Sequence, residues 1–160
     1  MNNELALYVD ELHRLFDRLE QSVRGLDERT LNWRPPVAEP NSIFVLGTHI
    51  LGNAEGWILG IACGQRIPRD RDAEFVSSGS SAAPLLDGAQ ELLQRIDAAL
   101  AALPEGALDE ERDPTQALWG VGTTHPVSVR EAIMHVIEHA ALHLGHIDMV
   151  KELAKAGVAS

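Results

Sequence analysis

The sequence predicts an all-α fold, a four-helix bundle, from three observations. Leucine and alanine are abundant while aromatic residues make up only 4% of the chain, and this composition favours helices over sheets. Four long segments repeat apolar residues at steps of three and four, which is the spacing of an amphipathic helix. The 160 residues are 45% hydrophobic, so we expect residues 1–160 to form a single domain with its own core.

The first helix is expected over residues 3–24, because apolar side chains recur along one face and Gly25 is a suitable stop. His13 lies beside this apolar face, which indicates a solvated surface position. Residues 26–40 are expected to form a connection without a regular helix, because the second half of this stretch contains three prolines. Trp33, within the connection, is expected to cover one end of the bundle.

The second helix is expected to begin at Asn41 or Ser42, which are both good N-cap residues, and to run to about Cys63. Its glycines lower the helix propensity, so we expect them to serve either close helix packing or room around a site. These residues are Gly47, Gly52 and Gly56.

The third helix is expected to begin with Ser81 or a neighbour as its N-cap, to carry Pro84 in its first turn and to run to Leu103. It carries no histidine and is assigned to core packing alone. The fourth helix is expected to begin with a capping box between Ser128 and Glu131 and to run to about residue 155.

Long connections follow the second and third helices, over residues 64–82 and 104–126. The stretch from Arg69 to Glu74 is dense in charge, and we favour a solvated surface turn with local ion pairs for it. The alternative is a lid or an anion-binding edge, because long loops in compact domains are often functional. In the second connection, Trp119 and its neighbouring glycines indicate a folded loop, and His125 is expected at the surface.

Four of the seven histidines lie in the fourth predicted helix, at spacings of four, four and three residues: His135, His139, His143 and His146. On a helix each of these steps returns to nearly the same face, with an offset of about 40° or 60°. Neighbouring apolar residues indicate that the helix is mostly buried. Because buried polar groups without partners are costly, this stripe of imidazoles predicts a metal site.

A third ligand is available in the second predicted helix, where His49 stands in an otherwise apolar stretch. Two histidines from the stripe and His49 would form a three-nitrogen site with an open coordination position, which is the catalytic arrangement of zinc rather than the structural one. Any two neighbours in the stripe satisfy the spacing. The other interpretations are hydrogen-bonded core histidines, a pH switch or an oligomer seam.

The net charge of −11 argues against nucleic acid and anionic membranes as partners, since both attract basic patches. Cys63 is the only cysteine, so no intrachain disulfide can form, and we expect a reducing, cytoplasmic location. The sequence shows neither a signal peptide nor an apolar run of membrane-spanning length.

Three motifs resemble the DinB/YfiT-like superfamily of metal-dependent four-helix bundles. They are Trp33-Arg34-Pro35-Pro36 with Asn41-Ser42, the helix with His49 followed by Glu55 and Trp57, and the run from His135 to Ile147, which is similar to H-x3-H-x3-H-R-G-Q. The resemblance implies a bundle with long connections after helices 2 and 3. It also selects His49, His139 and His143 as the metal ligands.

The chain departs from the family pattern after the third of these ligands, where Leu144 replaces an arginine and His146 replaces a glutamine. This ending is more similar to the branch related to mycothiol-dependent proteins. Asn53 and His146 are candidates to orient a ligand or the incoming group from outside the metal sphere.

The resemblance implies a metal-dependent S-transferase or isomerase that uses a low-molecular-weight thiol and a small-molecule substrate. The expected metal is a divalent transition ion, zinc first, with nickel or iron as alternatives, and a homodimer is expected. The metal would hold the thiol as a thiolate.

One alternative is a metal-dependent hydrolase, although no carboxylate is clearly aimed at the site. The other is a non-enzymatic, stress-related metal-binding bundle. No catalytic residue is assigned.

Overall fold

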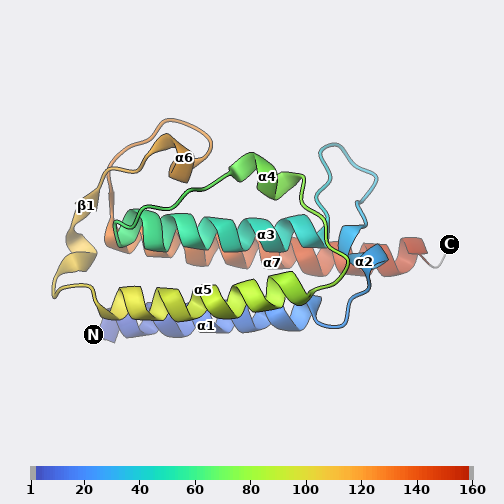
Figure 1. Cartoon of the computed structure of the whole chain (residues 1–160), viewed down its shortest axis with the longest axis horizontal. Coiled ribbons are helices and arrows are strands. Elements are labelled where there is room, and N and C mark those ends of the chain that lie inside the picture. Colours follow the sequence, from blue (N-terminus) through green and yellow to red (C-terminus); the bar gives the residue numbers. More distant parts are fainter. Residues whose placement is uncertain (1–2, 159–160) are drawn as a thin grey trace.

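Four long helices form the body of the protein in the computed structural model, which describes residues 3–158. They are α1 (Asn3–Val23), α3 (Ile43–Ala54) with its continuation η1 (Glu55–Ala62), α5 (Ala83–Ala101) and α7 (Val129–Val158). Figure 1 shows these helices side by side along the long axis of the molecule. The predicted all-α bundle and the order of its four helices are confirmed.

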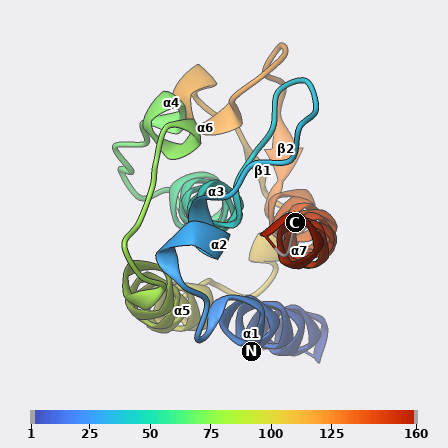
Figure 2. The same ribbon diagram turned by 90° about the vertical axis from the view of Figure 1, so that its right-hand side faces the viewer.

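Seen from the end of the bundle, each helix packs against two of the other three (Figure 2). Helix α7 lies against α1 and α3, and α5 closes the bundle on the opposite side. Their apolar faces meet in two clusters that include fully buried Leu12, Ile58 and Ile133 in one, and Ile43 and Leu144 in the other. Burying each such side chain contributes about 1.5–3 kcal/mol to folding, so α3 and α7 are firmly placed against each other.

The second predicted helix changes its geometry halfway along. Residues 55–62 form a π-helix, in which Cys63 N–H donates to the Ile58 carbonyl at 2.9 Å, five residues earlier. Glycines in this segment allow the loops above it to approach closely, because a Cβ at Gly60 would lie 2.8 Å from Leu118 Cδ1. Sequence reasoning predicted one regular helix here. π-helical turns are rare and often occur at functional sites.

The helix ends agree in part with the predicted caps. Ser42 Oγ accepts a hydrogen bond from the N–H of Val45 at 3.2 Å. The capping box of α7 is also present, because Glu131 N–H donates to Ser128 Oγ at 3.1 Å and Ser128 N–H donates to Glu131 Oε2 at 2.7 Å. Helix α5 differs, since its N-cap residue is Ala82 and makes no side-chain bond.

The connections contain short elements. These are α2 (Glu28–Asn32), α4 (Arg71–Phe75), the 3-10 turn η2 (Ala107–Asp109), α6 (Gln116–Trp119), and strands β1 (Glu111–Arg112) and β2 (Val127–Ser128), which pair antiparallel. The expectation of no helix over residues 26–40 is wrong for residues 28–32, which precede the prolines and are capped by Asp27. Figure 1 shows α4 and α6 above α3, on the side of the molecule away from α1 and α5. No helix among the described residues has the length and apolarity needed to cross a membrane.

Candidate metal centre

Three histidines from two helices converge between α3 and α7. His49 comes from α3, His139 and His143 come from successive turns of α7, and one nitrogen from each lies within 4.8 Å of the others. The Nε2 atoms of His49 and His139 are 3.0 Å apart, and the His139 and His143 rings are 4.4 Å apart between centroids. The structure therefore brings together the three residues predicted as ligands.

The chemistry of this set fits a divalent metal. Burial, together with the smaller effect of the neighbouring imidazoles, lowers the pKa of His139 to about 2 and the pKa of His143 to about 4. Both rings are therefore uncharged at neutral pH and carry lone pairs. Two neutral imidazole nitrogens facing each other at 3.0 Å would share one proton or a cation, and a transition metal satisfies both lone pairs. His139 Nδ1 is buried without a partner among the described residues.

Glu74 of α4 sets the orientation of His49. Its Oε2 atom lies 2.6 Å from His49 Nδ1, which places the imidazole proton on Nδ1 and leaves the Nε2 lone pair free toward the other two rings. Arg69 donates to both carboxylate oxygens, from Nε to Oε1 at 2.8 Å and from Nη2 to Oε2 at 3.1 Å. Burial alone would raise the pKa of Glu74, but the hydrogen bonds from His49 and Arg69 hold it below its usual value.

The preferred interpretation of residues 69–74 as a solvated turn with local ion pairs is right about the ion pair between Arg69 and Glu74 but wrong about the solvation of these two residues. The side chains of Arg69 and Glu74 are only 4% and 7% exposed. Arg69 Nη1 also donates to the Leu118 carbonyl of α6 at 3.2 Å, so it ties α4 to the second long connection. Sequence reasoning missed Glu74 because the charge density of the loop was visible but the direction of each side chain was not.

Gly52 of α3 makes room for the Glu74 carboxylate. A Cβ at this position would overlap the Oε1 atom of Glu74. Of the two roles expected for the helix glycines, room around a site therefore applies to Gly52. Gly47 instead serves packing, since a Cβ there would lie 2.9 Å from Leu85 Cδ1.

The remaining members of the histidine stripe lie beside the set of three. His135 stacks on Trp57 with ring centroids 3.8 Å apart, and its Nε2 atom is 3.3 Å from Asn53 Nδ2. Asn53 thus contacts His135 rather than a predicted ligand. His146 is exposed and its Nδ1 atom is 3.4 Å from His143 Nδ1, so it stands at the solvent side of the cluster.

Other residues considered from sequence lie outside the cluster. His125 is exposed and packs on Trp119, and His13 pairs with Asp97 at 2.9 Å. Burial raises the pKa of Cys63 to about 11, so its thiol is protonated at neutral pH and is a poor nucleophile.

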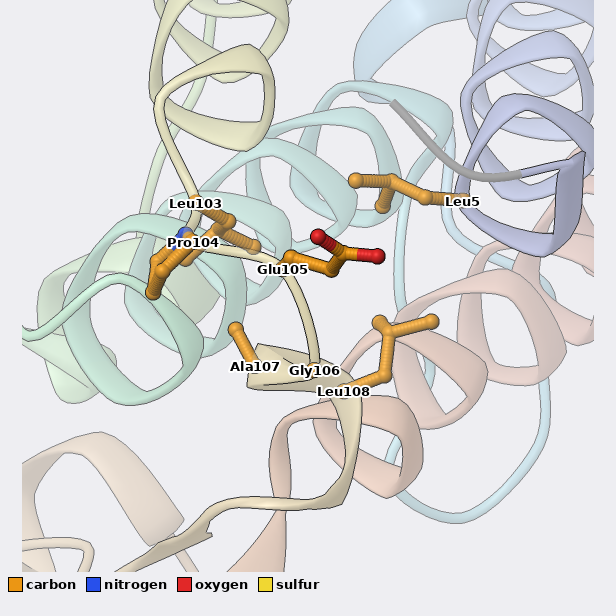
Figure 3. A pocket seen from close by; sticks show the side chains of 7 residues that line it. All are labelled: Leu5, Leu103, Pro104, Glu105, Gly106, Ala107 and Leu108. Atoms are coloured by element: carbon orange, nitrogen blue, oxygen red, sulfur yellow. The ribbon is translucent and has the colours of Figure 1, made fainter.

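A hollow at the end of the bundle where α1 begins and α5 ends has a different character (Figure 3). Among the described residues its lining is mostly aliphatic, with Glu105 as the only ionisable side chain. It therefore offers no set of ligands that could compete with the three histidines for a metal.

Comparisons with known proteins identify the family of the chain and proteins of similar fold. A family model described as mycothiol-S-transferase matches residues 8–156. The fold is similar to that of a DinB-like protein from Bacillus cereus ATCC 10987, at 15% identity over 92% of this chain and 91% of that one, with a TM-score of 0.72. It is also similar to a conserved protein from Enterococcus faecalis, at 16% identity over 98% and 99% of the chains, with a TM-score of 0.70. The search of curated proteins found no significant match. The DinB-like resemblance is thereby confirmed.

We expect His139→Ala to abolish metal binding, because two imidazoles alone hold a divalent ion weakly. Elemental analysis of protein purified without a histidine tag should find about one equivalent of a transition metal in the parent and almost none in the variant. His125→Ala is the control, since it removes a histidine outside the cluster. Equal metal content in the parent and His139→Ala would contradict the assignment.

We expect Glu74→Gln to weaken metal binding by between about tenfold and a hundredfold, because the neutral amide no longer fixes the His49 tautomer. Competition with a chromogenic chelator measures the change. Glu55→Gln removes the same charge from a partly exposed ion pair with Arg95 and should leave affinity nearly unchanged. Unaltered affinity in Glu74→Gln would show that His49 is oriented by packing alone.

The metal-free protein should lose stability as the pH falls from about 6.5 toward 4. The lowered pKa values of His139 and His143 mean that the unfolded chain binds more protons than the folded chain in this window, so acid favours unfolding. Urea unfolding in the presence of a chelator at pH 7.5, 6 and 5 measures the slope. His143→Asn should give a shallower slope, and an identical slope would contradict the neutral buried state of His143.

Proposed function

Because the chain belongs to the mycothiol S-transferase family, we propose that it is a metal-dependent transferase that joins a low-molecular-weight thiol to a small electrophile. The observation that carries the proposal is the convergence of His49, His139 and His143, with His49 oriented by buried Glu74. These three residues are the proposed ligands. Zinc is the proposed metal, with nickel or iron as alternatives, since three imidazoles suit all of them and the transfer needs no redox change.

The reaction would form a bond between the thiol sulfur and an electrophilic carbon while the leaving group departs with its electron pair. A divalent metal held by three neutral imidazoles supplies the positive charge that lowers the pKa of a bound thiol and holds it as a thiolate. Glu74 keeps the proton of His49 on Nδ1. His146, exposed beside His143, is the proposed first acceptor of the thiol proton, which then passes to solvent.

The hydrolase alternative needs a carboxylate free to act as a base on a bound water. Glu74 is the buried carboxylate at this cluster, and it is engaged by His49 and Arg69 on the side of the imidazole away from Nε2. We therefore rank the thiol reaction above hydrolysis. The non-enzymatic alternative, a stress-related metal-binding bundle, remains as an outcome of the test below.

We also propose a homodimer and a cytoplasmic location. Support for the dimer comes from apolar side chains on the outer face of α7, where Leu142, Met149 and Leu153 are 58%, 61% and 46% exposed. Support for the location comes from the single cysteine, Cys63, which cannot form an intrachain disulfide.

The metal-loaded protein should accelerate conjugation of a cellular thiol to a chromogenic electrophile such as 1-chloro-2,4-dinitrobenzene. Mycothiol, bacillithiol, glutathione and cysteine should be compared by product absorbance, with His125→Ala as the control variant. His139→Ala should reduce kcat/KM at least a hundredfold, because it removes the thiolate-stabilising charge. Absence of acceleration with every thiol, together with a lower melting temperature after chelation, would favour the non-enzymatic alternative.

A further inference from the structure

A second hollow lies beside the metal cluster, between the proline-rich connection and α4. It has a volume of about 400 Å³ and is lined by Arg34, Glu39, Pro40, Asn41, Arg71 and Phe75. The chain as a whole is negatively charged, with 24 acidic and 13 basic residues, so two arginines at one hollow make this part of the surface more positive than the rest.

Neither arginine is neutralised by a carboxylate. Among the residues that the structure describes, seven of the eleven arginines form ion pairs, and Arg34 and Arg71 are among the four that form none. Glu39 borders the same hollow without pairing with either of them, and Asp70, next to Arg71 in sequence, accepts the N–H of Ala73 at 3.0 Å as the cap of α4. Two unpaired guanidinium groups against one carboxylate leave the lining with a net positive charge.

Both guanidinium groups are held in place by other contacts. Arg34 Nη1 donates to the Pro40 carbonyl at 2.8 Å, and Nη2 lies 3.4 Å from the Phe75 carbonyl. A guanidinium has five N–H donors, and these two contacts use only two of them. Arg71 lies over the Phe75 ring, 4.7 Å from its centroid, and its N–H groups make no hydrogen bond to any residue that the structure describes.

The hollow adjoins the proposed reaction centre through one aromatic ring. Phe75 contacts both Arg71, which lies over its ring, and His49, whose ring centroid is 4.8 Å from that of Phe75. A molecule whose charged end lies between Arg34 and Arg71 could therefore extend past Phe75 toward the three histidines.

We propose that Arg34 and Arg71 bind a carboxylate of the electrophilic substrate. This inference rests on the proposed function and names the class of acceptor, a small carboxylate-bearing electrophile. A planar carboxylate matches the fork of guanidinium donors better than a neutral group does. The anion-binding edge considered for the charged loop is thus assigned to Arg71, while Glu74 of the same loop is bound to His49 and Arg69 is bound to Glu74.

Iodoacetate and iodoacetamide form a matched pair of acceptors for the test. In both, the thiolate sulfur bonds to the methylene carbon and iodide leaves, so they differ mainly in the charge next to that carbon. The ratio of kcat/KM for iodoacetate to kcat/KM for iodoacetamide should fall on the order of tenfold in Arg71→Gln and in Arg34→Gln. Arg71→Lys should fall less, because it keeps the charge. Arg66→Gln is the control, since Arg66 is exposed and lines neither this hollow nor the metal cluster.

Equilibrium binding separates this inference from the proposed function. Calorimetric titration of the metal-loaded protein with malonate, at constant ionic strength set by chloride, needs no turnover. Malonate should bind at least fivefold more weakly to Arg71→Gln than to the parent and Arg66→Gln. If that loss occurs without catalysis, the carboxylate site stands and the transferase proposal fails. If catalysis occurs but neither the ratio nor malonate binding depends on Arg34 or Arg71, the carboxylate site is overturned.

Discussion

The hydrogen bond between His49 and Glu74 is the contact on which the geometry of the cluster depends. An imidazole on a buried helix can present either nitrogen to its neighbours, and the carboxylate settles the choice in favour of Nε2. Arg69 offsets the cost of burying that carboxylate, and its third contact, with Leu118 O, joins the two long connections above α3. The loops therefore do more than link helices, because they complete the surroundings of a residue that the bundle alone would leave free to rotate.

The bundle provides the complementary constraint. Packing of α3 against α7 holds three imidazoles so close that burial and mutual repulsion keep His139 and His143 uncharged. An arrangement of neutral nitrogens around a shared point is unfavourable for the bare protein and favourable once a cation is present. The histidine cluster thus lowers the folding stability of the metal-free protein and raises its affinity for a metal ion. The aliphatic clusters on either side support the surrounding helices.

Much of this architecture follows from local sequence rules. Helix periodicity predicted the four long helices, and a spacing of four residues placed His139 and His143 on one face. That His49 meets them depends on the approach of α3 to α7, which the family resemblance implied. The role of Glu74 could not be predicted, because a carboxylate in a loop has no periodicity and its direction depends on tertiary packing with Arg69 and Gly52. The π-helical turn after Ala54 was hidden for a similar reason, since its wider bonding accompanies the close approach of Leu118 to Gly60. The assignment of the three histidines as ligands stays a prediction.

The contact between Gly52 and the Glu74 carboxylate has a consequence for the evolution of this family. Any residue larger than glycine at that position would displace the carboxylate, so a lineage could change position 52 only after, or together with, position 74. The two positions lie 22 residues apart and on different elements, yet their residue types should covary among relatives. Relatives that carry a side chain at the first position should have lost the acid at the second and should restrain their α3 histidine by some other means.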